Sequence, residues 1–188
     1  MMQTQQAQTL NGFDLNELEE LSGAIATNPL QAKLTFQVSS AWVDGPRSIS
    51  HVKSFDWGSE TYDRDFTLVI DEPKEIGGSN LGPNPQEVLL SAINSCILAT
   101  FTELCTAYGI RLEKAEIKSS GYLDLRGFFG LDPSIVPGCQ SLYWTLIVKG
   151  DATAKQFQEI YEMTLMASPN LWNMANPVSI VPQIQIEA

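Results

Sequence analysis

The feature that most constrains this chain is a long apolar segment near its middle, introduced by residues that favour a helix start. Asn84 stands at a capping position, Pro85 at the first helical position and Glu87 where a capping box places its acid. Gly109 is placed to end the helix, so the spacing predicts about 24 helical residues, or roughly 36 Å. After Glu87 its only charge is Glu103, and apolar side chains cover nearly every side. A helix that is apolar all round must be buried all round.

Such a helix needs more cover than one small sheet provides, because a sheet covers one side only. A second copy of the chain is the natural cover for the other sides. No uninterrupted apolar run reaches the roughly 18 residues of a membrane span, so we expect no membrane partner. The net charge of -11 also argues against nucleic acid and anionic membrane surfaces, which attract basic proteins.

The remaining pattern predicts an α+β fold. We expect a flexible tail over residues 1–12, an N-terminal helix over 13–30 and one domain over 31–188. Asp14 can cap that first helix, and another helix is predicted from Thr153 to just before Pro169. Strands are predicted from period-two alternation within 33–42, 47–55, 66–70, 115–125, 142–148 and 178–186. No series of βαβ units is present, which favours α+β over a doubly wound fold.

Three cysteines at irregular spacing make no disulfide framework, and the first ten residues do not resemble a signal peptide. A cytoplasmic protein with free thiols is therefore expected. Cys96 lies in the middle of the long helix, where a cysteine is most often a small core residue. Cys105 lies about 180° around the helix and roughly 13 Å along it, and is expected in the core. Cys139 follows Pro137-Gly138 and is interpreted as a loop thiol.

Neither a metal site nor a cofactor site is predicted. The chain has one histidine, His51, and no cysteine pair at zinc spacing. No Gly-x-Ser-x-Gly elbow accompanies the histidine. The glycines at 77 and 78 lack the Lys-Ser/Thr that completes a phosphate loop.

The segment around the start of the long helix is more informative. Residues 82–96 read GPNPQEVLLSAINSC, which resembles the OsmC/Ohr family of osmotically inducible and organic-hydroperoxide-resistance proteins. Ser168-Pro169 and Asn176-Pro177-Val178 resemble the end of that family's last helix and its last strand. The resemblance runs from about residue 32 to 188. It implies an intertwined homodimer, with antiparallel sheets around long central helices and active sites at the dimer interface.

The resemblance also implies a chemistry for Cys96. In the family a cysteine thiolate attacks the terminal oxygen of a hydroperoxide, a second cysteine condenses with the sulfenic acid, and an external dithiol resets the enzyme. A nearby arginine lowers a thiol's pKa and polarises the peroxide. Arg47 is the best-placed arginine by the resemblance, and a solvated turn residue is an equal alternative for it. Three other arginines are less well placed, namely Arg64, Arg111 and Arg126.

Two positions depart from the family's two-cysteine pattern. Gln86 stands ten residues before Cys96, where hydroperoxidases carry a glutamate, and Glu87 is one residue further on. Ser168 stands where the second cysteine is expected, and serine cannot resolve a sulfenic acid. Either an outside thiol does so, or Cys139 substitutes, or the peroxidase cycle is absent.

The sequence thus predicts a homodimeric, thiol-dependent reductase of organic hydroperoxides in a stress response. Cys96 is the nucleophile, Arg47 the activator, Glu87 or Gln86 its orienter, and an external thiol the reductant. The alternative is a non-enzymatic module that binds a small apolar ligand at the dimer interface, with Cys96 not catalytic. A third reading is a structural remnant in which Cys96 is inert.

Overall fold

The computed structural model describes residues 9–187 and divides the chain into two compact units, residues 1–91 and 92–188. Most of the expected tail, residues 1–8, lies outside the described residues. The end of that tail differs from expectation, because Thr9–Leu10 (β1) pairs antiparallel with Phe13–Asp14 (β2). Asn11 and Gly12 have φ of 51° and 86°, the left-handed values that a two-residue hairpin turn requires.

The predicted N-terminal helix is present as α1, Leu15–Thr27. It begins where its capping residue predicted. The Asp14 carboxylate accepts hydrogen bonds from the backbone N–H groups of Asn16 and Glu17, at 2.9 and 3.4 Å. These bonds satisfy two of the N–H groups that a helix start leaves without partners.

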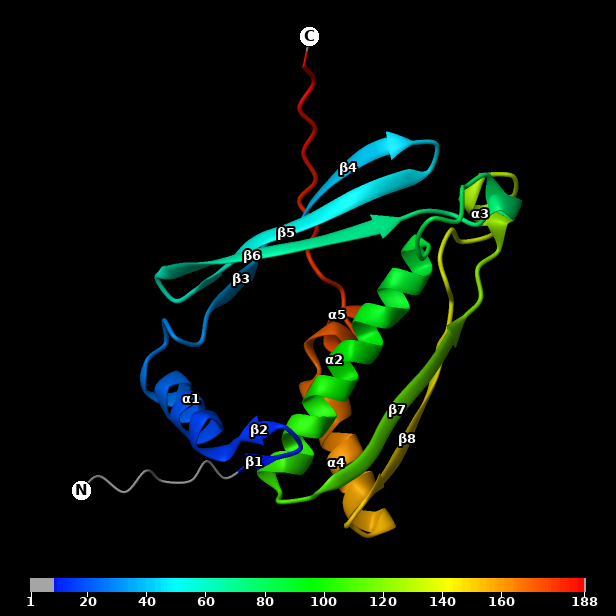
Figure 1. The fold of residues 1–188 in the computed structure, drawn as a ribbon. Coiled ribbons are helices and arrows are strands. Elements are labelled where there is room, and N and C mark those ends of the chain that lie inside the picture. Colours follow the sequence, from blue (N-terminus) through cyan, green and yellow to red (C-terminus); the bar gives the residue numbers. More distant parts are fainter. Residues whose placement is uncertain (1–8, 188) are drawn as a thin grey trace, which may run out of the picture. The chain divides into compact units, whose positions relative to one another are not determined.

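An antiparallel sheet follows, with β5 (Arg47–Trp57) at its centre (Figure 1). One edge of β5 pairs with β6 (Glu60–Ile70), and the other pairs with β3 (Leu34–Phe36) and β4 (Ser39–Asp44). The sequence predicted one strand over 33–42. The structure instead forms two, because residues 37 and 38 leave the ladder between the two pairings with β5.

The segment between β6 and the long helix is held by a buried carboxylate. Asp71 is 1% exposed and accepts hydrogen bonds from three backbone N–H groups, those of Glu72, Ser79 and Leu81. A short 3-10 turn, Lys74–Ile76, lies inside the loop that these bonds close. A Cβ at Gly82 would collide with the carbonyl oxygen of Val69, so the chain leaving the loop packs directly on β6.

The long helix is α2, Pro85–Ala107, and the prediction of its length is confirmed. Gly109 follows with φ of 70°, the left-handed conformation of a helix end. Within the single chain only one stripe of α2 is fully covered, comprising Ile93, Ile97, Phe101, Cys105 and Thr106. The other apolar faces are partly or fully exposed in this chain.

By length and composition alone, α2 is the one helix among residues 9–187 that could cross a membrane, because it is long, its mean hydropathy is high and it carries few charges. The core helix of a soluble protein passes the same test. The expectation that the chain has no membrane partner therefore stays a prediction.

The second unit contains a hairpin of β7 (Leu112–Gly121) and β8 (Leu142–Gly150). Its helices are α3 (Leu125–Phe128), α4 (Ala154–Ala167) and α5 (Pro169–Ala175). The buried centre consists of Phe101, Cys105, Ile110 and Ile160, with partly buried residues of β8 and α4 around them. Helix α4 starts with a capping box, in which Thr153 and Gln156 bond each other's backbone N–H. The α+β class with antiparallel sheets is confirmed.

Three elements of the second unit differ from the sequence prediction. Strand β7 ends at Gly121, because Asp124 caps the short helix α3 and takes the chain out of the ladder. Helix α5 was not predicted at all. The last predicted strand, 178–186, is not formed in the single chain, where Ile180 and Ile184 are 84% and 86% exposed. A strand needs a neighbour for its backbone hydrogen bonds, and this segment has none among the described residues.

A candidate thiol site at Cys96

The Cys96 sulfur lies where α2 meets the junction of α4 and α5. The Ser168 hydroxyl donates a hydrogen bond to Cys96 Sγ at 3.3 Å, and the Asn170 backbone N–H donates another at 3.4 Å. The cysteine is half-buried rather than enclosed. The site therefore combines a sulfur that accepts two hydrogen bonds with a cysteine that is not fully buried, all within the second unit.

Ser168 is fully buried and serves two helices through its backbone. Its N–H donates to the Thr164 carbonyl at the end of α4, and its carbonyl accepts from Trp172 in the first turn of α5. A serine at a helix start ordinarily uses its hydroxyl to accept a backbone N–H. Ser168 makes no such bond, and its hydroxyl is directed at Cys96 instead.

The other two thiols have different surroundings. Cys105 is fully buried in the core cluster, as predicted, and this burial raises its pKa to about 11. Cys139 is half-buried beside β7, where a Cβ on Gly121 would lie 3.1 Å from its sulfur. It lines a cavity of about 250 Å³ together with Ile93 of α2 and Leu171 of α5. These two neighbours belong to the same two helices that hold Cys96.

The three remaining predicted site residues lie in the first unit. Arg47 is half-buried at the start of β5, where the register places Asp44 opposite it. Glu87 is engaged in the predicted capping box. Its carboxylate accepts from the Asn84 N–H at 2.8 Å, and the Asn84 side chain accepts from the Glu87 N–H at 2.8 Å. Gln86 is exposed in the same first turn of α2.

Glu87 also influences a neighbouring acid. Burial raises the pKa of Glu72 above the ordinary glutamate value, and the negative charges of Glu87 and Asp71 raise it further. The start of α2 therefore gathers three carboxylates in the first unit.

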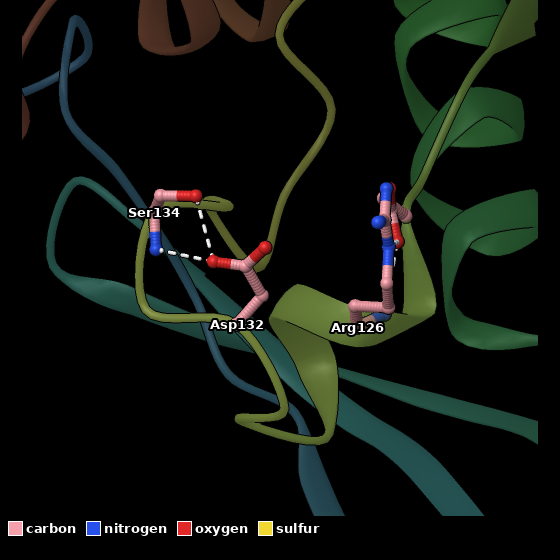
Figure 2. A network of polar contacts seen from close by, with 4 residues as sticks. Arg126, Asp132 and Ser134 are labelled. Atoms are coloured by element: carbon pink, nitrogen blue, oxygen red, sulfur yellow. Dashed lines mark hydrogen bonds and ion pairs between the residues drawn. The ribbon is translucent and has the colours of Figure 1, made fainter.

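Two of the three arginines that the sequence ranked lower have other side-chain partners. Arg126 donates from Nε and Nη2 to the two carboxylate oxygens of Asp124, at 3.1 and 2.6 Å (Figure 2). Nearby, Ser134 donates from its N–H and its hydroxyl to Asp132. Arg64 lies over the rings of Phe55 and Phe66. The Arg126 pair lines a cavity of about 370 Å³, distinct in its residues from the surroundings of Cys96.

His51 lies on β5, where Nδ1 is 3.2 Å from the Thr67 hydroxyl. Within residues 9–187, no group of three or more His, Cys, Asp or Glu side chains is placed to hold a metal ion.

Sequence reasoning missed Asn170, whose side-chain amide donates to the Ala92 carbonyl of α2 at 2.9 Å. A signal for the helix that carries it was present. Ser168-Pro169 places a capping serine before a proline at the first helical position, which is a helix start. The contact itself joins residues 78 positions apart and leaves no local trace in the sequence.

Comparison with known proteins places this chain in a family context. The sequence profile of the OsmC-like protein family matches residues 77–182, more than half of the chain. No curated protein matches the sequence.

Several solved structures share the fold. An OsmC-like protein from Mycoplasma pneumoniae is 14% identical, with a TM-score of 0.59 over 75% of this chain and 87% of that one. A Psychrobacter arcticus protein, assigned to osmotic stress induction and a detoxification response, is 13% identical, with a TM-score of 0.55 over 71% and 84% of the chains. An OsmC-like protein of unknown function from Vibrio cholerae is 10% identical, with a TM-score of 0.55 over 72% and 90%.

Proposed function

The chain belongs to the OsmC-like protein family, and from that premise we propose that it reduces organic hydroperoxides through a single reactive cysteine, Cys96. The observation that carries this proposal is the pair of hydrogen bonds from Ser168 and Asn170 to Cys96 Sγ. Donors directed at a sulfur favour negative charge on it, and the thiolate is the nucleophilic form of cysteine. The detoxification role assigned to the Psychrobacter arcticus protein of the same fold points in the same direction.

The proposed reaction needs no resolving cysteine in the chain. The thiolate attacks the terminal oxygen of the hydroperoxide, an S–O bond forms, the O–O bond breaks, and the leaving alkoxide takes a proton to become an alcohol. One external thiol then displaces water from the sulfenic acid and forms a mixed disulfide. A second thiol releases Cys96 and leaves as a disulfide with the first. The sum is one hydroperoxide and two thiols converted to one alcohol, one water and one disulfide.

Arg47 is proposed to activate Cys96 and polarise the peroxide, with Glu87 or Gln86 orienting the guanidinium. Glu87 keeps the capacity for both duties, because the capping bond engages only one oxygen of its carboxylate. Carboxylates hold arginine through paired, charge-assisted bonds, which an amide such as Gln86 provides only in weaker form.

The decisive experiment measures turnover of cumene hydroperoxide with several thiol reductants. Wild type should show turnover that depends on the reductant, Cys96→Ser should show none, and Cys139→Ser should match wild type. Loss of activity in Cys139→Ser would assign the resolving role to Cys139 and remove the one-cysteine mechanism. An unreactive wild type with every reductant would reject the peroxidase proposal.

A second candidate function is the non-enzymatic binding of a small apolar ligand. The observation that favours it is a cavity of about 510 Å³ in the second unit, lined mainly by aromatic and aliphatic side chains, among them Phe101, Trp144 and Phe157. Mass spectrometry of the protein under native conditions distinguishes the two. A retained lipid-like molecule together with an unreactive Cys96 would favour the binding module.

A further inference from the structure

Asn170 contacts the turn of α2 that carries Cys96 at two separate points. Its backbone N–H donates to Cys96 Sγ at 3.4 Å, and its side-chain Nδ2 donates to the Ala92 carbonyl at 2.9 Å. In an α-helix the carbonyl of residue 92 is also the one that the N–H of residue 96 bonds. One residue of α5 thus holds both ends of the helical turn from Ala92 to Cys96.

The two contacts depend on each other. The bond to sulfur is long, so a small shift of α5 would abolish it. The hydrogen bond from the Asn170 side-chain amide to the Ala92 carbonyl is the shorter of the two, and it fixes the distance between the start of α5 and α2. Ser168 is carried by the same segment, two residues earlier, and its hydroxyl is within 3.3 Å of the same sulfur. If α5 moved away from α2, both donors would leave the sulfur together.

We propose that Asn170 is a positioning residue for the oxidation of Cys96, acting through its side-chain bond to the Ala92 carbonyl. This inference rests on the proposed peroxidase function for the identity of the oxidant. The amide holds α5 so that the Ser168 hydroxyl and the Asn170 N–H both stay within hydrogen-bond distance of the sulfur. Attack on an O–O bond needs the sulfur in line with that bond, so a misplaced sulfur slows the step steeply.

The chain offers a matched control at the other end of α5. Asn176 Nδ2 donates to the Trp172 carbonyl at 2.9 Å, the same kind of bond at the same length. That bond lies wholly at the end of α5 and does not join it to α2. Asn170→Ala and Asn176→Ala each remove one hydrogen bond from a side-chain amide to a backbone carbonyl. Only the bond removed by Asn170→Ala joins α5 to the turn of α2 that carries Cys96.

The test follows Cys96 by peptide mass mapping in wild type, Asn170→Ala and Asn176→Ala. Two rates are measured at one pH near neutrality, oxidation by cumene hydroperoxide and alkylation by iodoacetamide. Asn170→Ala should slow oxidation on the order of tenfold and slow alkylation as well, because both donors leave the sulfur. Asn176→Ala should stay within twofold of wild type in both rates.

Equal rates in Asn170→Ala and Asn176→Ala, or slowing only in proportion to a lowered urea midpoint, would overturn the positioning role. Asn170→Asp serves as a second variant if the alanine protein does not fold. It keeps the shape and the backbone N–H but presents an acceptor to the Ala92 carbonyl, and it should be slowed as well. If wild type resists cumene hydroperoxide, the proposed function is rejected, and the alkylation rates then decide whether Asn170 positions the sulfur: slower alkylation in Asn170→Ala than in Asn176→Ala supports that role, and equal rates reject it.

Discussion

Cys96 and Ser168 would be a pair of thiols if the Ser168 hydroxyl oxygen were replaced by sulfur. The Ser168 hydroxyl oxygen lies 3.3 Å from Cys96 Sγ, so a sulfur at residue 168 would start close to bonding range and need only a rotamer change. We expect Ser168→Cys to form an intramolecular disulfide with Cys96 after one equivalent of cumene hydroperoxide. Intact mass should fall by two hydrogens and peptide mapping should give the 96–168 pair.

Two results bound that prediction. Wild type under the same treatment should gain one oxygen atom instead. The double variant Cys96→Ser, Ser168→Cys should form no intramolecular bridge. A bridge from residue 168 to Cys139 would contradict the geometry described for the α4–α5 junction.

The three thiols should also separate by rate. Burial raises the pKa of Cys105 to about 11, so only about one molecule in a thousand carries its thiolate at pH 8. We expect iodoacetamide to modify Cys96 first and Cys105 only through unfolding. In denaturant all three should react alike. Equal rates for Cys96 and Cys105 in the native protein would contradict the burial of Cys105.

For single residues, the sequence predicts those whose role depends on local spacing or belongs to a recognisable motif. Cys105 follows from helix spacing, and Ser168 follows from its place before Pro169. Asn170 does not follow, because its value comes from a contact with a turn 78 residues away.

At the scale of elements, the start of α2 combines capping with a proposed catalytic duty, and one substitution separates them. Gln at residue 87 keeps a carbonyl oxygen for the Asn84 N–H but has no charge to hold Arg47. We expect Glu87→Gln to leave the urea midpoint near wild type and to lower peroxidase turnover at least tenfold. Asn84→Ala should instead cost about 1 kcal/mol of stability. Full turnover in Glu87→Gln would assign Glu87 to capping alone.

The acidic group at this helix start predicts a pH dependence. The pKa of Glu72 is raised by burial and by Glu87 and Asp71, so the folded state holds its proton more tightly than the unfolded chain. Above the ordinary glutamate pKa the charged Glu72 therefore destabilises the fold, and this cost disappears as pH falls. Glu72→Gln should raise unfolding free energy at pH 7 by about 0.5 kcal/mol, a small effect because solvent screens these charges. Urea titrations at pH 7 and pH 3.5 should show a gain at the first pH and none at the second.

Elements with strong local signals were predicted well, and those that depend on partners were not. Asp14 caps α1 as its place in the sequence predicts, and capping boxes form at the starts of α2 and α4. The strand expected over 33–42 is divided in two where residues 37 and 38 leave the ladder with β5. The strand expected over 178–186 has the right alternation but no neighbouring strand among residues 9–187. The periodicity of apolar residues indicates which side chains are buried in the folded protein, but it does not indicate which element or chain covers them.

For the whole molecule, the apolar surface left by the single chain supports the proposed homodimer. Large exposed hydrophobic residues occur on the first sheet and along the C-terminal segment, including Phe36 at 69%, Trp42 at 75% and Ile186 at 83%. Exposed apolar side chains in such numbers are typical of protein interfaces. Sedimentation equilibrium at micromolar concentration should give twice the 20.7 kDa chain mass. A stable, folded monomer there would reject the homodimer.

The unpaired C-terminal segment has a consequence for the kinetics of folding. If residues 178–186 become a strand only against a second copy, the last hydrogen bonds of the fold form in a bimolecular step. Refolding would then have a phase whose half-time lengthens about tenfold when the protein is diluted tenfold, after a faster phase that is independent of concentration. Until that step is complete, each chain exposes an unpaired, isoleucine-rich segment. Other incompletely folded chains can pair with such a segment and form aggregates. Refolding at low protein concentration would therefore be slow but free of aggregation, and refolding at high concentration would be fast but accompanied by aggregation.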